Sequence, residues 1–137
     1  MYIFKMMLGY KSNNNVVYSS KYHVVWCPKY RRKVLEGAVA KDLFALIHKT
    51  ALKYRAEIIA LEISADRVHL LVEVDPQLGI HRLVKYIKGV TSHDLRKKHE
   101  SLRSRLPSLW TNSYFVCTVG GAPLEVIKQY VENQKNV

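Results

Sequence analysis

Two side chains capable of chemistry, Tyr130 and Gln134, lie four residues apart near the end of the 137-residue sequence. On a helix, residues at i and i+4 share a face, so a phenol hydroxyl would stand beside an amide oxygen. Upstream, His69 lies within the apolar run 68–74, which is typical of a strand that carries one inward histidine. A metal-binding histidine that faces this tyrosine would suit a tyrosine nucleophile attacking a phosphodiester.

His69 is the strongest single candidate for a metal ligand, because transition and borderline cations accept neutral imidazole and a strand fixes its direction. Its alternative role is that of a hydrogen-bonded core histidine. Glu62 lies on the preceding apolar run, and a hairpin that turns through 64–66 would place its carboxylate on the same face as His69. There it would supply the oxygen that Mg²⁺ or Mn²⁺ prefers. A register shift of one residue would instead leave Glu62 as a surface residue on the other face.

The elements that must position these residues follow from hydrophobic periodicity and turn signals. Strands are predicted at 22–27, 57–63, 68–74 and 113–119, and helices at 38–55, from 80 onward and at 122–135. The second helix is expected to be interrupted near Gly89 and to restart at Ser92, and a loop is expected at 101–110. This order, β-α-β-β-α-β-α, predicts an α+β, ferredoxin-like antiparallel sheet with an added C-terminal helix that carries Tyr130. Residues 1–17 are expected to form a loose N-terminal arm, and 18–137 a single catalytic domain.

The charge of the chain favours a polyanionic partner. Lysine and arginine total 22 against 11 acidic residues, a formal charge of +11. The basic clusters alternate with Tyr30, Tyr86 and Trp110, which fits phosphate tracking and base stacking on a single strand or hairpin. The residues predicted to contact DNA are Lys29, Arg31, Arg32, Lys85, Lys88, Arg96 and Lys97. No apolar run is long enough to span a membrane and no signal peptide is evident, so a cytoplasmic location is expected.

Several stretches together resemble the small single-tyrosine transposases of prokaryotic insertion sequences, the IS200-like group of the His-hydrophobe-His nuclease superfamily. The resemblance runs from about Tyr18 to Gln134 and is carried by the order and spacing of 23–33, 87–89, 110–116, 118–120 and Tyr130-x-x-x-Gln134. It implies a metal-dependent enzyme that nicks and rejoins single-stranded DNA through a 5′-phosphotyrosine on Tyr130. Mg²⁺ or Mn²⁺ would be held by Glu62, His69 and, as the third ligand, Gln134.

The same resemblance has implications for partners. It implies a homodimer in which the tyrosine helix of one subunit can serve the metal site of the other. It also implies recognition of subterminal DNA hairpins, with little interest in plain duplex.

One position departs from the family pattern. The family normally has His-x-His on this strand, and here the first histidine is replaced by Arg67, which has no lone pair to give a metal. Arg67 would either hold a DNA phosphate or pair with Glu62 or Asp66 and silence the site, and the sequence leaves both open. His23 and Asp66 are expected beside the metal rather than on it. Asp66 would brace an imidazole or simply form the turn.

Two other functions stand as alternatives to the transposase. The first is a catalytically disabled relative that binds single strands or hairpins, and metal-dependent covalent attachment to DNA separates it from the enzyme. The second is an RNA-binding module on a ferredoxin-like fold. The aromatic signature of that module, Lys/Arg-Gly-Phe/Tyr-Gly/Ala-Phe-Val-x-Phe/Tyr, is absent from the sequence.

Overall fold

The computed structural model describes residues 10–119 and 124–137. The main sheet contains β3 (Lys21–Trp26), β4 (Glu57–Ser64), β5 (Arg67–Glu73) and β6 (Phe115–Thr118). The helices are α2 (Gly37–Lys53), α3 (Ile80–Lys98), α4 (Glu100–Arg105) and α5 (Leu124–Glu132), with 3-10 turns η1 (Lys29–Arg31) and η2 (Asn133–Asn136). The predicted start of the last helix, at 122–123, lies outside the described residues.

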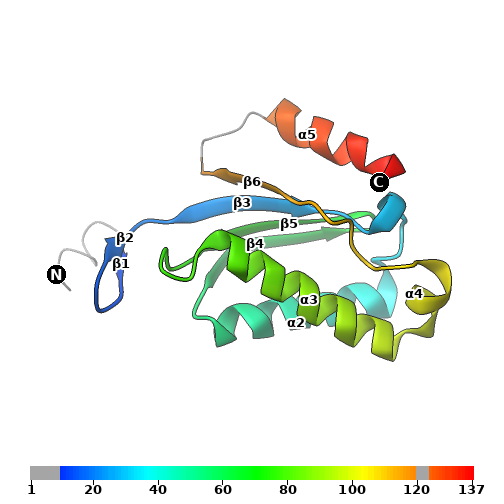
Figure 1. Ribbon diagram of the computed structural model, residues 1–137, viewed down its shortest axis with the longest axis horizontal. Helices are drawn as coiled ribbons and strands as arrows, with labels where there is room; N and C mark the ends of the chain where they lie inside the picture. Colours follow the sequence, from blue (N-terminus) through cyan, green and yellow to red (C-terminus); the bar gives the residue numbers. More distant parts are fainter. Residues whose placement is uncertain (1–9, 120–123) are drawn as a thin grey trace.

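The sheet has the ferredoxin-like arrangement that the sequence predicts. Its strands lie in the order β4-β5-β3-β6, and every neighbouring pair is antiparallel. Helices α2 and α3 cover one face, and α5 lies on the other (Figure 1). The sheet therefore separates a core under two helices from a second face under the C-terminal helix.

Alternation along the two central strands assigns each side chain to one of these faces. Val24 and Leu70 are fully buried in the hydrophobic core beneath α2 and α3. Because the side-chain period of a strand is two, the neighbouring residues His23, Val25 and His69 are turned toward the α5 side. The same apolar pattern that builds the core thus brings the histidines to the opposite face.

Replacing Leu70 with alanine is expected to lower the free energy of unfolding by about 3 kcal/mol, because it leaves a cavity in a close-packed core. Urea denaturation measures this loss. Leu52→Ala is the matched control, since Leu52 is 79% exposed and its truncation is expected to change stability by less than about 0.5 kcal/mol. Equal losses in the two variants would contradict the placement of Leu70 in the core.

The interruption predicted in the second helix is wrong. α3 runs unbroken through Gly89 and Ser92, and its buried stripe, which includes Ile87 and Thr91, continues across them. A single glycine inside a helix costs only about 1 kcal/mol relative to alanine. Packing of the stripe against the core outweighs that cost.

The predicted loop at 101–110 is wrong in its first part, where the chain forms α4. Leu102 anchors this short helix in the core, with 1% of its surface exposed. Arg96 on α3 donates from Nη1 to the carbonyl of Leu106, just past the end of α4, at 3.0 Å. Contacts from outside the segment therefore stabilise a helix that its own six residues do not signal.

Part of the predicted N-terminal arm forms secondary structure within the residues that the structure describes. Strands β1 (Lys11–Ser12) and β2 (Val17–Tyr18) pair as a small antiparallel hairpin. Asn13 at its turn donates from Nδ2 to the carboxylate of Asp75 at 2.8 Å. The hairpin is thereby attached to the main domain; residues 1–9 lie outside the described ranges.

Candidate functional site

One row of side chains crosses the sheet on the α5 side. Glu62 is paired in register with His69, His69 with Val25, and Val25 with Phe115. Residues paired in this way share a face of the sheet. The predicted hairpin is confirmed, because it places Glu62 directly opposite His69. Two candidate metal ligands therefore stand at one end of the row and Phe115 at the other.

A second imidazole lies beside His69. Nδ1 of His23 is 3.2 Å from Nε2 of His69, and the two ring centroids are 5.3 Å apart. Burial lowers the pKa of His69 and the neighbouring His23 lowers it further, whereas the carboxylate of Glu62 raises it. His69 is therefore neutral near pH 7, which is the form of imidazole that binds cations.

Tyr130 lies over the far end of this row. Its ring centroid is 5.6 Å from that of Phe115, and its hydroxyl is 2.9 Å from Oγ of Ser113. Burial raises the pKa of Tyr130, although the hydrogen bond with Ser113 acts in the opposite direction. The phenol is thus protonated at neutral pH, and attack would need a base or a polarised phosphate. Two strand spacings, roughly 10 Å, separate Phe115 from His69.

Gln134 is buried in η2, just after the helix that carries Tyr130, with 5% of its surface exposed. Its Nε2 donates to the carbonyl of Tyr130 at 3.3 Å. Its Oε1 is buried and has no hydrogen-bond partner among the residues that the structure describes. An unpartnered buried acceptor costs about 1–3 kcal/mol, and a bound cation or a water would remove that cost.

These donors suit a divalent cation but do not form a closed cage by themselves. Carboxylate and amide oxygens match Mg²⁺ and Mn²⁺, and imidazole matches the softer of the two. Within 10–119 and 124–137, no three His, Cys, Asp or Glu side chains are grouped as a metal centre. A cation held by Glu62 and His69 would need further oxygen ligands to complete its coordination.

Asp66, at the hairpin turn, is the centre of an ion-pair network. Its carboxylate accepts a hydrogen bond from Nη1 of Arg67 at 2.9 Å and lies 3.1 Å from Nε of Arg31. Arg31 also reaches the carboxylate of Glu132 at 3.3 Å. The sequence left two roles open for Arg67, a contact with a DNA phosphate and an ion pair with Glu62 or Asp66. In the structure, Arg67 forms an ion pair with Asp66 and not with Glu62. The network fastens the turn next to His69 to the C-terminal helix.

Asp66→Asn keeps the shape of the side chain but leaves Arg31 and Arg67 without their shared anion. Because the Asp66 side chain is only 10% exposed, this variant is expected to lower the free energy of unfolding by about 2 kcal/mol. Glu132→Gln breaks a pair whose acid is 59% exposed, and a loss below about 1 kcal/mol is expected. Chemical denaturation compares the two, and a larger loss for Glu132→Gln would contradict the central place of Asp66.

The seven basic residues predicted to contact DNA divide into two groups. Arg31, Lys88 and Arg96 are partly buried and bind other parts of the chain. Nζ of Lys88 donates to the carbonyls of Thr111 and Ser113 at 2.7 and 3.0 Å, and burial lowers its pKa to about 8. Among the described residues, no side-chain hydrogen bond or ion pair is formed by Lys29, Arg32, Lys85 or Lys97.

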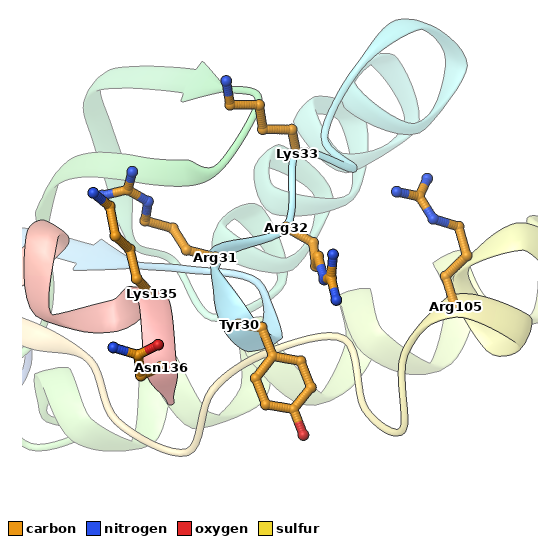
Figure 2. A pocket seen from close by; sticks show the side chains of 7 residues that line it. All are labelled: Tyr30, Arg31, Arg32, Lys33, Arg105, Lys135 and Asn136. Atoms are coloured by element: carbon orange, nitrogen blue, oxygen red, sulfur yellow. The ribbon is translucent and has the colours of Figure 1, made fainter.

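A cationic hollow of about 700 Å³ lies beside the C-terminal turn (Figure 2). It is lined by Tyr30, Arg31, Arg32, Lys33, Arg105, Lys135 and Asn136. These residues come from η1 and the connector after it, from the end of α4 and from η2. The sequence points to Arg31 and Arg32 as DNA contacts, but it carries no signal that Lys135 joins them, because distant segments meet only in the fold.

Comparisons with known proteins give a consistent result. The family model described as "Transposase IS200 like" matches residues 16–134. The ISDra2 transposase TnpA of Deinococcus radiodurans is 35% identical over 129 residues, which cover 93% of this chain and 92% of that protein. The transposase for insertion sequence element IS200 of Salmonella typhimurium is 29% identical over 126 residues, 90% of this chain and 82% of that protein.

A solved structure agrees with the sequence relatives. The crystal structure of a Deinococcus radiodurans protein named as a transposase superposes with a TM-score of 0.81 at 33% identity, and the match covers 93% of this chain and 99% of that one. Among the helices that the structure describes, none has the length and apolar character needed to cross a membrane.

Proposed function

Because the chain belongs to the IS200-like transposase family, we propose that it cleaves and rejoins single-stranded DNA at the ends of an insertion sequence, with Tyr130 as the nucleophile. One observation carries the proposal. The Tyr130 ring packs against Phe115, which stands in the same row of the sheet as His69, and Gln134, whose buried Oε1 has no partner among the described residues, lies in η2 just after the helix of Tyr130. The location of Tyr130 on the side of the sheet that carries Glu62 and His69 supports the proposed roles of these residues.

The proposed reaction transfers a phosphoryl group without loss of the phosphodiester energy. The Tyr130 hydroxyl gives up its proton to solvent water, and its oxygen forms a bond to phosphorus while the bond from phosphorus to the 3′ oxygen breaks. The products are a 5′-phosphotyrosine and, once the leaving oxygen gains a proton, a free 3′-OH. Attack by a second 3′-OH reverses the step, so no ATP is needed. Ser113 would orient the phenol, since its Oγ is the hydrogen-bond partner of the hydroxyl.

Glu62, His69 and Gln134 are the proposed ligands of Mg²⁺ or Mn²⁺. The buried Oε1 of Gln134, which lacks a hydrogen-bond partner in the described part of the chain, and the register that sets Glu62 opposite His69 support this assignment. Such a cation polarises a phosphate and stabilises charge on a departing oxygen. His23 would orient the ring of His69 through their contact, as groups next to metal ligands do.

The proposed active unit is a homodimer in which Tyr130 of one subunit serves the metal site of the other. Membership of the IS200-like family supports this arrangement, because the sequence resemblance implies such a dimer. Mixing Tyr130→Phe subunits with His69→Ala subunits tests it. A mixed dimer that works in trans has one intact site and regains activity, whereas one that works within each subunit has none. Inactive mixtures with proven subunit exchange would exclude the trans arrangement.

The function itself is tested by a denaturing-gel assay for a covalent protein–DNA adduct. Single-stranded oligonucleotides from the DNA that flanks this gene are incubated with the protein in Mn²⁺, in Mg²⁺ or in EDTA. An adduct is expected only with a divalent cation. Tight hairpin binding without any adduct would overturn the proposed chemistry.

That negative outcome would favour the second candidate, a non-catalytic relative that binds hairpin DNA. The observation in its favour is the ion pair of Arg67 with Asp66, which leaves Arg67 as a structural residue on the face of His69. Arg67→His separates the two readings. Appearance of an adduct in this variant alone would identify Arg67 as the cause of the lost activity.

A further inference from the structure

The hollow beside the C-terminal turn carries positive charge that the fold itself does not neutralise. Arg31 is paired with Asp66, and Lys135 with Glu132. The other cations of the lining form no side-chain hydrogen bond or ion pair with any described residue: Arg32, Lys33 and Arg105. No acidic side chain lines the hollow within the described ranges. At least three cations there are thus left for a partner.

The free guanidinium groups face the same space from different elements. Figure 2 shows the side chain of Arg32, which follows η1, and that of Arg105, at the end of α4, directed toward one opening. Like charges held close together repel, so an anion that enters the hollow is stabilised. Guanidinium groups bind phosphate through paired N–H donors. A volume of about 700 Å³ is that of a site for a whole ligand rather than for one small ion.

An aromatic ring adjoins these cations. Tyr30 is 44% exposed, and its backbone φ of 58° lies in the left-handed region, which is unfavourable for a bulky residue. The conformation is held because its N–H donates to the carbonyl of Val137 at 2.8 Å. An exposed ring in the lining of a cationic hollow, on a backbone held in this way, is suited to stack on an unpaired base.

We propose that this hollow binds the backbone phosphates of a single DNA strand, with Tyr30 stacked on one of its bases. The choice of DNA rests on the proposed function, and the inference adds the path of the strand. Lys135 and Asn136, which line the hollow, directly follow Gln134 in η2. The strand would therefore pass from the hollow along η2 to Tyr130.

The test measures DNA binding without cleavage, as the fluorescence anisotropy of a labelled oligothymidylate in EDTA with Tyr130→Phe protein. Adding Arg32→Ala and Arg105→Ala together is expected to weaken binding about tenfold near 0.1 M salt. The slope of log affinity against log salt is expected to fall by about 1.4, because each lost contact with a single strand contributes about 0.7.

The matched control removes the same charge elsewhere. Lys41 and Lys49 are exposed on α2 and are not among the residues that line the hollow. Their double alanine variant is expected to change affinity by less than about twofold. Equal losses in the two double variants, or no loss from Arg32 and Arg105, would overturn the hollow as a binding site. If a blunt duplex binds as tightly as the single strand and loses the same affinity on substitution of Arg32 and Arg105, the assignment to single-stranded DNA is overturned.

The role of Tyr30 is tested with an abasic strand of equal charge. The protein with Tyr30 intact is expected to bind this strand about threefold or more weakly than oligothymidylate, and Tyr30→Ala is expected to remove the difference. Equal binding of the two strands before substitution would overturn the stacking role. None of these binding measurements needs cleavage. If the protein forms no adduct but its variants show these losses of affinity, the proposed chemistry is excluded while the hollow remains assigned as a DNA-binding site.

Discussion

Replacing Tyr130 with phenylalanine is expected to abolish the covalent protein–DNA adduct and to lower strand cleavage by about a thousandfold or more. The variant keeps the ring that packs against Phe115 and loses the oxygen that would bond to phosphorus. It also loses the hydrogen bond with Ser113, worth about 1 kcal/mol, so the protein is expected to remain folded. Denaturing gels with a labelled strand measure the adduct, and anisotropy shows whether DNA is still bound.

Tyr114→Phe is the matched control. Among the described residues, the hydroxyl of Tyr114 likewise has one hydrogen-bond partner, Nδ1 of His81 at 2.8 Å, and burial also raises the pKa of Tyr114. The substitution therefore removes the same atom from a similar setting, and the adduct is expected to persist. Loss of the adduct in Tyr114→Phe but not in Tyr130→Phe would identify Tyr114, and not Tyr130, as the nucleophile.

The row that contains His69 shows how far local sequence patterns reach. The register is set by the two-residue period of the strands and by a short turn, so alternation alone places Glu62 opposite His69. Helical spacing likewise predicts the amide oxygen of Gln134 beside the hydroxyl of Tyr130; in the structure Gln134 lies one turn from Tyr130, but its Nε2 bonds to the carbonyl of Tyr130 and the hydroxyl bonds to Ser113. Both predictions concern residues close in sequence, where geometry leaves few alternatives.

Contacts between segments that are distant in sequence could not be predicted from these local patterns. Lys88 has the appearance of a solvated cation in the sequence, yet it binds two backbone carbonyls, one of them that of Ser113. Ser113 in turn is the partner of Tyr130, although no spacing rule relates the two. A basic side chain looks the same in a sequence whether it meets solvent, a carbonyl or an acid such as Asp66. The division of the predicted DNA contacts therefore depends on packing that only the fold provides.

Replacing His69 with alanine is expected to weaken Mn²⁺ binding by about a hundredfold or more and to abolish the metal-dependent adduct. Loss of a group that merely supports a metal ligand costs about 10–100-fold in affinity, and loss of the ligand itself is expected to cost at least the upper end of that range. Electron paramagnetic resonance of added Mn²⁺ measures binding independently of activity. Thermal denaturation of the same samples shows whether the fold is kept.

Two histidine controls separate a metal ligand from a structural histidine. His23→Ala is expected to weaken Mn²⁺ binding about tenfold, since His23 contacts His69 and would orient it. His48→Ala is expected to have no effect on Mn²⁺ binding, because His48 is exposed on α2 and, among the described rings, contacts only that of Phe44. If the contact between His23 and His69 serves only the fold, both of their variants lower stability and leave Mn²⁺ affinity unchanged. That result would contradict the metal site and leave a DNA-binding protein without the proposed chemistry.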